Sequence, residues 1–270
     1  MTATTPLGIT LSITNSILAV FGSAVNLLVC IVIYKNEELQ NGLDLLIANL
    51  CFADLSVCFI AQPMYVAYLN GKLSAETENA FSYISLIALH AVALNLLAIA
   101  VNRMIAIAHP FTNTFMFSKF KVLMVICAIW VSAIVAAVFL FTKPGKLFSP
   151  YSHIMIILTF LCCYARIFFI ARKQRRQINI QMQSVSHNHQ TVRLQKANRA
   201  NITSALIVLS LMACFFPDTV YDFLPIEIME VRKKWLFTLL FLSCSVNPCI
   251  YMWRTEVFKV AMKRTLRISQ

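Results

Sequence analysis

Two ionisable side chains lie within otherwise apolar stretches of this sequence. Arg103 stands in LLAIAVNRMIAIAHPF, residues 96–111, and Asp54 stands in NLCFADL, residues 49–55. An arginine or aspartate at the centre of a bilayer costs roughly 2.5–3.5 kcal/mol on insertion scales. Both side chains are therefore expected to face the protein interior, where such groups bind ions, relay protons or switch a conformation.

Neutral polar residues are expected to join Asp54 at the same depth. Asn26 occurs in GSAVNLLV and Asn247 in SVNPCIY, each within an apolar run. Polar side chains in a membrane bundle hydrogen-bond across helices, so Asn26, Asp54, Ser243 and Asn247 are predicted to form one inner network. Pro248 follows directly, and its missing N–H is expected to break the last helix and free a backbone carbonyl.

A second proline interrupts a later apolar run. Pro217 occurs in ACFFPDTVY, directly after Phe215 and Phe216. A proline beside bulky aromatic residues predicts a hinge with a packing switch; a static kink is the alternative, because kinks are common in membrane helices. No nucleophile–base pair, metal-ligand spacing or phosphate-binding loop accompanies these residues. The sequence therefore does not indicate an enzyme.

The composition indicates that a membrane surrounds the elements that position these residues. The 270 residues are 59% hydrophobic and 13% charged, with a mean hydropathy of +0.74, whereas soluble domains are about a quarter charged. Apolar runs that are long enough for a helix to cross about 30 Å of hydrocarbon predict an all-α membrane protein. We expect one domain over residues 1–270, a seven-transmembrane helix bundle with spans at about 8–34, 45–71, 77–108, 120–142, 150–176, 195–223 and 232–253.

The end of the chain predicts a short eighth helix. In residues 254–267 apolar side chains alternate with Lys259, Lys263, Arg264 and Arg267 at helical spacing. This pattern is typical of an amphipathic helix that lies on the inner membrane surface. A frayed chain end is the alternative.

The basic residues are divided unequally between the two ends of the predicted spans. If the loop at residues 35–44 is inside, 17 of the 23 Lys and Arg residues lie on that side. The positive-inside rule then predicts an extracellular amino terminus and a cytoplasmic carboxyl terminus, in a multi-pass protein of the plasma membrane. Orientation and contact with anionic membrane lipid account for the net charge of +12, and no nucleic-acid partner is expected.

The polar residues and prolines follow one another in an order that resembles rhodopsin-like (class A) G-protein-coupled receptors over essentially the whole chain. The matching positions are Asn26, Asp54, Pro63, Arg103, Trp130, Tyr164, Pro217 in CFFP and the complete NPCIY motif that ends at Tyr251. The resemblance implies a receptor that transduces an extracellular small-molecule or peptide signal to a heterotrimeric G protein.

The resemblance also implies roles for individual residues. It assigns a G-protein coupling and activation switch to Asn102, Arg103, Tyr164, Phe215, Pro217, Asn247, Pro248 and Tyr251. It assigns a ligand pocket to Tyr65, Ser82, Ser85, Leu86, Leu89, Asp218, Tyr221, Asp222 and Phe237, with Asp218 either a partner for a ligand cation or a solvated acid. No resident cofactor is expected, apart from a sodium ion held by Asp54 with Ser243 and Asn247. Val92 stands where the family usually supplies a hydroxyl for that ion.

Several positions depart from the family pattern. Asn102 replaces the acid that usually pairs with the arginine, Ala197 replaces an acid low on the sixth helix, and Glu78 stands where a disulfide cysteine is usual. The missing disulfide, the short second outer loop and Ile156 in place of a proline are similar to the melanocortin, lysosphingolipid, cannabinoid and adenosine group, particularly to melanocortin receptors. Because neither acid is present, Arg103 is expected to be weakly restrained and basal activity to be raised.

Two other functions are left open by the sequence. The altered Asn102–Arg103–Met104 motif is compatible with a decoy receptor that binds a ligand without coupling. Asp54 and Arg103 could instead act as relay groups of a transporter or proton channel. The scarcity of further charges within the apolar runs argues against such a relay.

Overall fold

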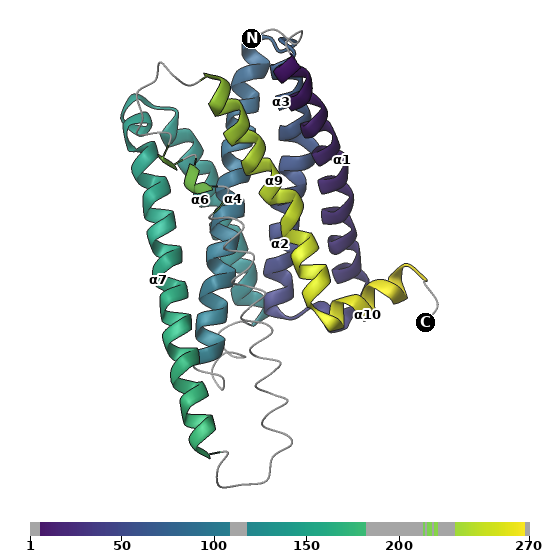
Figure 1. Ribbon diagram of the computed structural model, residues 1–270, viewed down its shortest axis with the longest axis vertical. Helices are drawn as coiled ribbons and strands as arrows, with labels where there is room; N and C mark the ends of the chain where they lie inside the picture. Colours follow the sequence, from purple (N-terminus) through teal and green to yellow (C-terminus); the bar gives the residue numbers. More distant parts are fainter. Residues whose placement is uncertain are drawn as a thin grey trace.

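The computed structural model shows a bundle of long helices that run side by side (Figure 1). The structure describes residues 6–108, 118–181, 213, 215–217, 219–220 and 230–267. The first turn of α1 lies at the upper end of the bundle in Figure 1, and α10 lies across the lower end. In chain order the helices are α1 (Pro6–Lys35), η1 (Glu37–Leu39), α2 (Gly42–Ser56), η2 (Val57–Ala61), α3 (Gln62–Leu69), α4 (Ala75–Ala108), α6 (Lys119–Leu140), α7 (Lys143–Gln181), α9 (Glu230–Arg254) and α10 (Glu256–Thr265).

Five helical segments of the described chain are long and apolar enough to cross a membrane. They are Pro6–Lys35, Gly42–Leu69, Ala75–Ala106, Lys119–Leu140 and Lys234–Trp253, and α7 contains a shorter apolar segment, Ile154–Ile170. These segments coincide with the first five predicted spans and the seventh. The sixth predicted span, 195–223, lies mostly outside the described residues. Within this span the structure describes residues 213, 215–217 and 219–220, and all of them are helical. A separate helix, α10, occupies most of the predicted eighth helix at 254–267.

α2 and α7 begin three or more residues earlier than the sequence predicted, because polar side chains cap their first turns. α2 begins at Gly42, where the Asn41 side chain accepts hydrogen bonds from the N–H groups of Leu43 at 3.0 Å and Asp44 at 3.1 Å. α7 begins at Lys143, well before the predicted residue 150, and the Thr142 hydroxyl accepts from the Gly145 N–H at 3.1 Å. Such caps satisfy backbone donors that have no partner within the helix. Hydropathy alone does not detect them.

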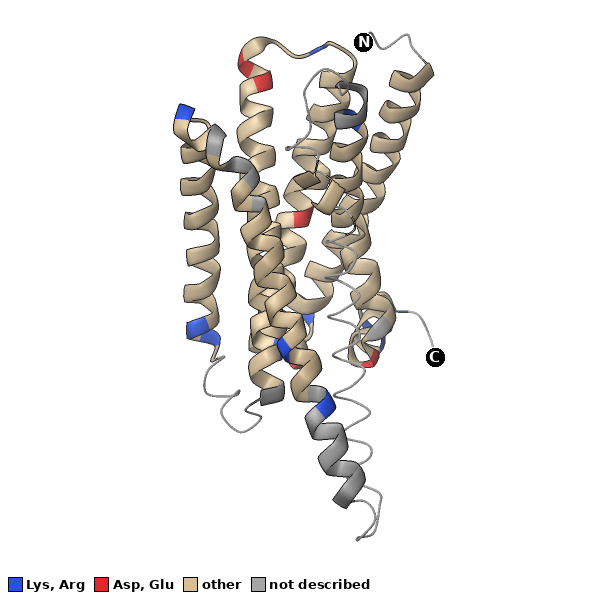
Figure 2. Cartoon of the chain, turned by 60° about the vertical axis from the view of Figure 1, so that its left-hand side comes forward, with Lys and Arg blue, Asp and Glu red and all other residues tan. Residues whose placement is uncertain are grey.

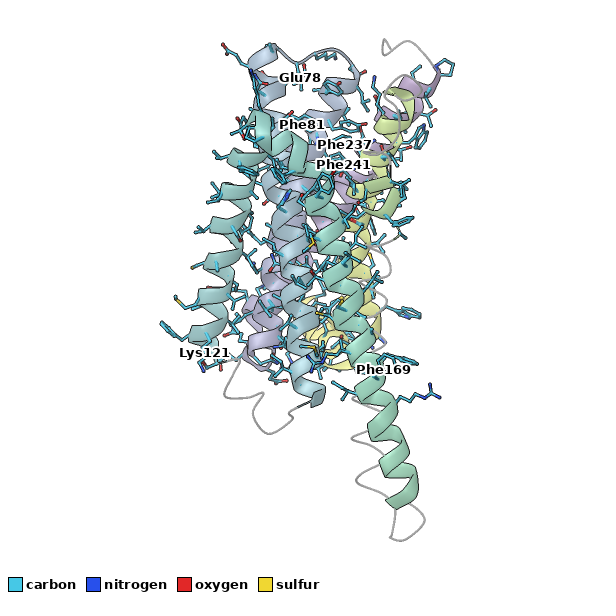
Figure 3. All side chains as sticks on the ribbon, turned by 90° about the vertical axis from the view of Figure 1, so that its left-hand side faces the viewer. Glu78, Phe81, Lys121, Phe169, Phe237 and Phe241 are labelled. Carbon is cyan, nitrogen blue, oxygen red and sulfur yellow. The ribbon has the colours of Figure 1, made fainter. Side chains whose placement is uncertain are left out.

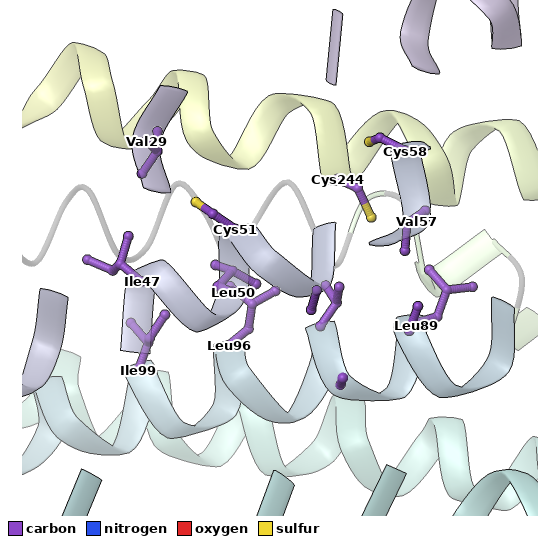
Figure 4. Packing of buried hydrophobic residues seen from close by; sticks show 14 of the residues in the cluster. Val29, Ile47, Leu50, Cys51, Val57, Cys58, Leu89, Leu96, Ile99 and Cys244 are labelled. Atoms are coloured by element: carbon purple, nitrogen blue, oxygen red, sulfur yellow. The ribbon is translucent and has the colours of Figure 1, made fainter. Parts of the chain in front are cut away.

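Aliphatic side chains between α2 and α4 form the centre of the bundle. Ile47 and Leu50 of α2 lie opposite Leu96 and Ile99 of α4, and all four are buried (Figure 4). Inside a membrane this contact is stabilised by close van der Waals packing rather than by removal from water. The packed centre fixes the relative height of the two helices that carry Asp54 and Arg103.

A polar bridge ties α6 to the same pair of helices. The Trp130 indole N–H donates to Asn49 Oδ1 at 3.0 Å, and Asn49 Nδ2 donates to Asn95 Oδ1 at 2.7 Å. Asn49 and Asn95 are buried on α2 and α4. The bridge gives three helices a common register, because each buried polar group depends on its neighbour for a partner.

Charged residues gather at the two ends of the bundle (Figure 2). Glu76 and Glu78 lie in the first turn of α4 at the upper end, and Lys35 lies in the last turn of α1 at the lower end. Between the ends, large apolar side chains face outward: Ile17 of α1 is 63% exposed and Val135 of α6 is 62% exposed. An apolar belt between two charged rims suits a bilayer.

Gly22 allows α1 to approach α9 and η2 closely. A Cβ at this position would lie 2.5 Å from Cys58 Sγ and 2.5 Å from Ser245 Oγ. The Ser245 hydroxyl also donates to the Leu18 carbonyl at 3.3 Å. Small residues at helix contacts permit such approach in membrane proteins.

We therefore predict that Gly22→Leu lowers the free energy of unfolding by about 1–3 kcal/mol, because the new side chain overfills a packed contact. Thermal melting of the detergent-purified protein measures this effect. Ala24→Leu is the matched control, since Ala24 is exposed on the same helix. Equal melting temperatures for the two variants would contradict the close contact.

Candidate functional site

Arg103 lies near the lower end of α4, where four helices meet. Asp44 of α2, Tyr164 of α7 and Tyr251 of α9 each interact electrostatically with its guanidinium group. The Tyr251 hydroxyl donates a hydrogen bond to Asp44 Oδ1 at 2.8 Å. Arg103 Nε is buried without a hydrogen-bond partner among the described residues. The structure thus brings three predicted switch residues together and leaves one arginine N–H donor available.

Asn102 contributes no charge to this cluster. The residue precedes Arg103 and is 3% exposed, and its carboxamide is neutral. The acid that interacts with Arg103 is Asp44, which lies in the first turn of α2 and not in the first inner loop as the sequence predicted.

α9 passes through Pro248 without a break. The sequence predicted a broken helix, but α9 is continuous from Glu230 to Arg254 with Pro248 inside it. Because proline has no N–H, the carbonyl of Cys244, four residues earlier, lacks its helical donor. Asn26 Nδ2 of α1 donates to this carbonyl at 3.1 Å. The freed carbonyl is therefore present as expected, and a neighbouring helix satisfies it.

The mid-bundle network contains three of the four residues predicted for it. Asn247 Nδ2 donates to Asp54 Oδ2 at 3.2 Å. Asn247 lies one turn after the Cys244 carbonyl of α9 that accepts from Asn26. Ser243 differs from the prediction, because its hydroxyl donates at 2.6 Å to the Leu240 carbonyl of its own helix. Serine in a helix commonly forms this local bond, which competes with bonds to other helices. In the described part of the chain, Oδ1 of Asn26, of Asp54 and of Asn247 is buried without a hydrogen-bond partner.

The described residues of the sixth span give part of the predicted hinge. Phe215 is half-buried and packs against the hydrophobic core, and Pro217 is helical. The Thr219 hydroxyl donates to the Phe215 carbonyl at 3.1 Å. The predicted pocket residues Asp218, Tyr221 and Asp222 lie outside the described residues.

An aromatic cluster occupies the upper end of the bundle. The ring centroid of Tyr65 lies 6.0 Å from that of Phe81, 5.8 Å from that of Phe237 and 5.4 Å from that of Phe241. Phe81, Phe237 and Phe241 lie close together below Glu78 in Figure 3. The Tyr65 hydroxyl donates to the Lys234 carbonyl at 2.7 Å, which joins α3 to α9. Tyr65 and Phe237, both predicted pocket residues, therefore belong to one cluster.

The predicted pocket residues of α4 differ in their polar partners. The Ser82 hydroxyl donates to the Glu78 carbonyl at 3.0 Å. Ser85 is 4% exposed, and its hydroxyl has no hydrogen-bond partner among the described residues. Leu86 is half-buried and Leu89 is buried. Among these four, Ser85 is the residue with an unused polar group.

Comparison with known proteins shows which family this chain is similar to. Residues 25–153 match the family model described as 7 transmembrane receptor (rhodopsin family). The melatonin receptor type 1B-B of Danio rerio is 24% identical over 254 residues, which cover 83% of this chain and 71% of that receptor. The adenosine receptor A2a of Canis lupus familiaris is 25% identical, with 96% of this chain and 72% of that receptor covered.

The chain is similar to rhodopsin-like G-protein-coupled receptors. The crystal structure of squid rhodopsin superposes on it with a TM-score of 0.83 at 17% sequence identity, covering 97% of this chain and 87% of that one. The predicted all-α, seven-transmembrane fold is confirmed. The prediction of a signalling receptor rather than an enzyme is also confirmed.

Sequence reasoning missed a polar chain near the upper end of the receptor. Asn15 Nδ2 of α1 donates to Thr238 Oγ1 of α9 at 2.9 Å, and Gln62 Nε2 of α3 donates to Asn15 Oδ1 at 3.1 Å. All three residues are buried. Each is a polar residue within an apolar run, and this feature of the sequence could have indicated a buried hydrogen-bond network.

Sequence reasoning also missed Asp44. It was assigned to a loop because the apolar run begins after it. The pattern Asn41-x-x-Asp44 was the available signal, because asparagine is a preferred N-cap and an acid in the first turn favours the helix dipole. The pattern would have moved the start of α2 to Gly42 and Asp44 into the bundle.

Proposed function

We propose that this receptor binds a small, neutral ligand from the extracellular side at its upper end and activates a heterotrimeric G protein at its lower end. The excess of Lys and Arg on the side of the first loop supports this orientation in the plasma membrane. The meeting of Arg103, Tyr164 and Tyr251 is the observation that carries the proposed coupling site. Tyr251 also packs against Phe258 of α10, with their ring centroids 5.0 Å apart.

The upper cluster supports a ligand with an aromatic or apolar body. Tyr65, Phe81, Phe237 and Phe241 supply ring faces and edges, and aromatic pairs prefer stacked or edge-to-face contacts. Ser85 supplies an unused hydroxyl. Ligand sites commonly combine an apolar lining with a few polar groups that fix orientation.

The names of the relatives support the same class of ligand. Melatonin and adenosine are small, neutral, heteroaromatic molecules with hydrogen-bonding groups. The sequence alone left both a small-molecule and a peptide ligand open. We favour the small neutral class, because the described aromatic and serine residues of the upper cluster carry no charge.

We predict that Ser85→Ala weakens ligand binding about fivefold, because one hydrogen bond to a buried group contributes on the order of 1 kcal/mol. Ser82→Ala is the matched control and should change the dissociation constant little, since the Ser82 hydroxyl is used within α4. A panel of nucleosides, indole amides, lipids, amines and peptides is first tested on a promiscuous G-protein reporter. Radioligand competition with an active compound then compares the variants. Equal affinity of the two variants, or activation by charged peptides alone, would contradict this pocket.

The proposed coupling site draws on three helices, α4, α7 and α9, with Arg103 and Tyr251 near the ends of α4 and α9 and Tyr164 midway along α7. Each brings one side chain to the lower end, where an arginine can donate several hydrogen bonds to a partner. A ligand at the upper end shifts an existing equilibrium between closed and open forms of this end. Pro217 and Phe215 are proposed as the hinge and the packing switch of this change.

We predict that Arg103→Ala reduces ligand-stimulated G-protein activation by tenfold or more while ligand binding is retained. Lys119→Ala is the matched control, since it removes one exposed positive charge at the same end. Nucleotide exchange in membranes with purified G protein measures the effect. Ligand binding with no exchange in the unchanged protein would favour the decoy receptor. Electrogenic flux in proteoliposomes would favour a transporter or proton channel.

We also propose that the mid-bundle network binds a sodium ion. Asp54 Oδ1, Asn247 Oδ1 and Asn26 Oδ1 are buried acceptor oxygens without hydrogen-bond partners among the described residues. Hard cations take oxygen ligands, and a buried carboxylate is costly without a compensating charge. Val92 adds no oxygen from α4, so Asp54 and the two amides, with Ser243 as a further acceptor, would hold the ion.

We predict that sodium chloride raises the melting temperature of the purified receptor relative to choline chloride at equal ionic strength, because an ion bound by the folded state stabilises it. Asp54→Asn should abolish the difference, since it removes the charge that attracts the ion. Glu38→Gln is the control for loss of an acid elsewhere and should retain the difference. No difference between the salts in the unchanged receptor would contradict the site.

A further inference from the structure

The surroundings of Asp44 set it apart from the other described acids at the lower end. Asp44 is 5% exposed in the first turn of α2. Glu38, at the same end, has a side chain that is 69% exposed and pairs with Arg264 at 3.4 Å. A buried carboxylate needs partners that compensate for lost hydration, whereas an exposed one does not.

Both oxygens of the Asp44 carboxylate have partners. Oδ1 accepts a hydrogen bond from the Tyr251 hydroxyl at 2.8 Å, and Oδ2 accepts one from Asn41 Nδ2. The Asp44 carboxylate and the Arg103 guanidinium of α4 are close enough to attract each other electrostatically, although they form no ion pair within 4.0 Å in the described structure. One acid of α2 thus contacts the switch residue of α9 and attracts the switch residue of α4.

We propose that Asp44 is the positioning residue for Arg103 and Tyr251, and that it takes over the restraint which Asn102 cannot provide. This inference rests on the proposed coupling role of Arg103. In the closed form, Asp44 holds the guanidinium by charge and the phenol by a hydrogen bond. Both side chains leave Asp44 when the lower end opens to a G protein.

If Asp44 restrains Arg103, raised basal activity is no longer expected of the unchanged receptor. That expectation considered the two acids of the family pattern, at positions 102 and 197. Asp44 is a third acid, on another helix, so the unchanged receptor should have lower basal activity than a variant that lacks the Asp44 charge.

The main competing role for Asp44 is local. Asn41 caps α2 and its side chain also bonds to Asp44, so the acid could serve only to stabilise the first turn of the helix. A purely local role predicts lower stability and less protein at the cell surface, without higher activity per receptor. The two roles therefore give opposite results in an activity assay.

The test uses Asp44→Asn, which keeps the size of the side chain and removes its charge. We expect agonist-independent G-protein activation per surface receptor to rise about fivefold or more, the range of a typical coupling between two sites. Glu38→Gln is the matched control, because it removes an exposed acid at the same end, and it should leave the activity unchanged.

A second variant separates positioning from folding. Asp44→Asn combined with Asn102→Asp returns an acid to the residue beside Arg103, so it should lower the activity again toward that of the unchanged receptor. A merely structural role for Asp44 would not be rescued at position 102. Equal basal activity of Asp44→Asn and the unchanged receptor, or failure of this rescue, would overturn the proposal.

Comparison with Arg103→Ala distinguishes failure of the proposed role of Asp44 from failure of the proposed coupling site. If Arg103→Ala removes signalling while Asp44→Asn leaves basal activity unchanged, the coupling role stands and the role of Asp44 is rejected. If Arg103→Ala leaves signalling intact, the coupling role is rejected, and a rise in Asp44→Asn would then have to act through Tyr251 alone. Tyr251→Phe, which removes the hydroxyl that bonds to Asp44, decides that last case by raising or not raising basal activity.

Discussion

The carbonyl of Cys244 has no backbone donor in α9, because Pro248 lacks the N–H that would reach it. In a membrane no water is available to satisfy such a group, so another part of the protein must do so. Asn26 of α1 provides the donor. This bond lets α9 continue through Pro248 and fixes α9 against α1. The positions of Asn247 beside Asp54 and of Tyr251 beside Asp44 both depend on the continuity of α9.

The charges of the two acids that α9 reaches are compensated to different extents. Asp54 is met by the neutral amide of Asn247, and one of its oxygens is left without a partner among the described residues. Asp44 has partners on both oxygens and interacts with the positive charge of Arg103. Charge balance at mid-bundle is therefore incomplete within the described chain, which favours an ion from solution. At the lower end the protein supplies the countercharge itself.

Hydropathy was sufficient to predict the seven-transmembrane fold, since lipid tolerates few structures other than long apolar helices. It was less informative at helix ends, where caps such as Asn41 and Thr142 extend α2 and α7 into polar sequence. Asp44 was missed for this reason. The network around Asp54 could be predicted from the depth of its residues, but the bond of Ser243 could not. A serine hydroxyl bonds to its own helix or to a neighbouring one according to the relative distances of the two acceptors, which a sequence does not contain.

The helix on which an acid lies determines what can release the arginine. An acid at position 102 would move with Arg103 as part of α4, so a rotation of that side chain would break the pair without any shift between helices. Asp44 belongs to α2, and its other partner, Tyr251, belongs to α9. Release then requires α2, α4 and α9 to change their relative positions at the lower end. Packed helices have few alternative arrangements, so such a restraint favours two discrete forms over a gradual loosening. Loss of the acid beside the arginine therefore does not by itself imply a receptor without restraint: in this bundle the restraint is transferred to the contacts between helices that activation must change.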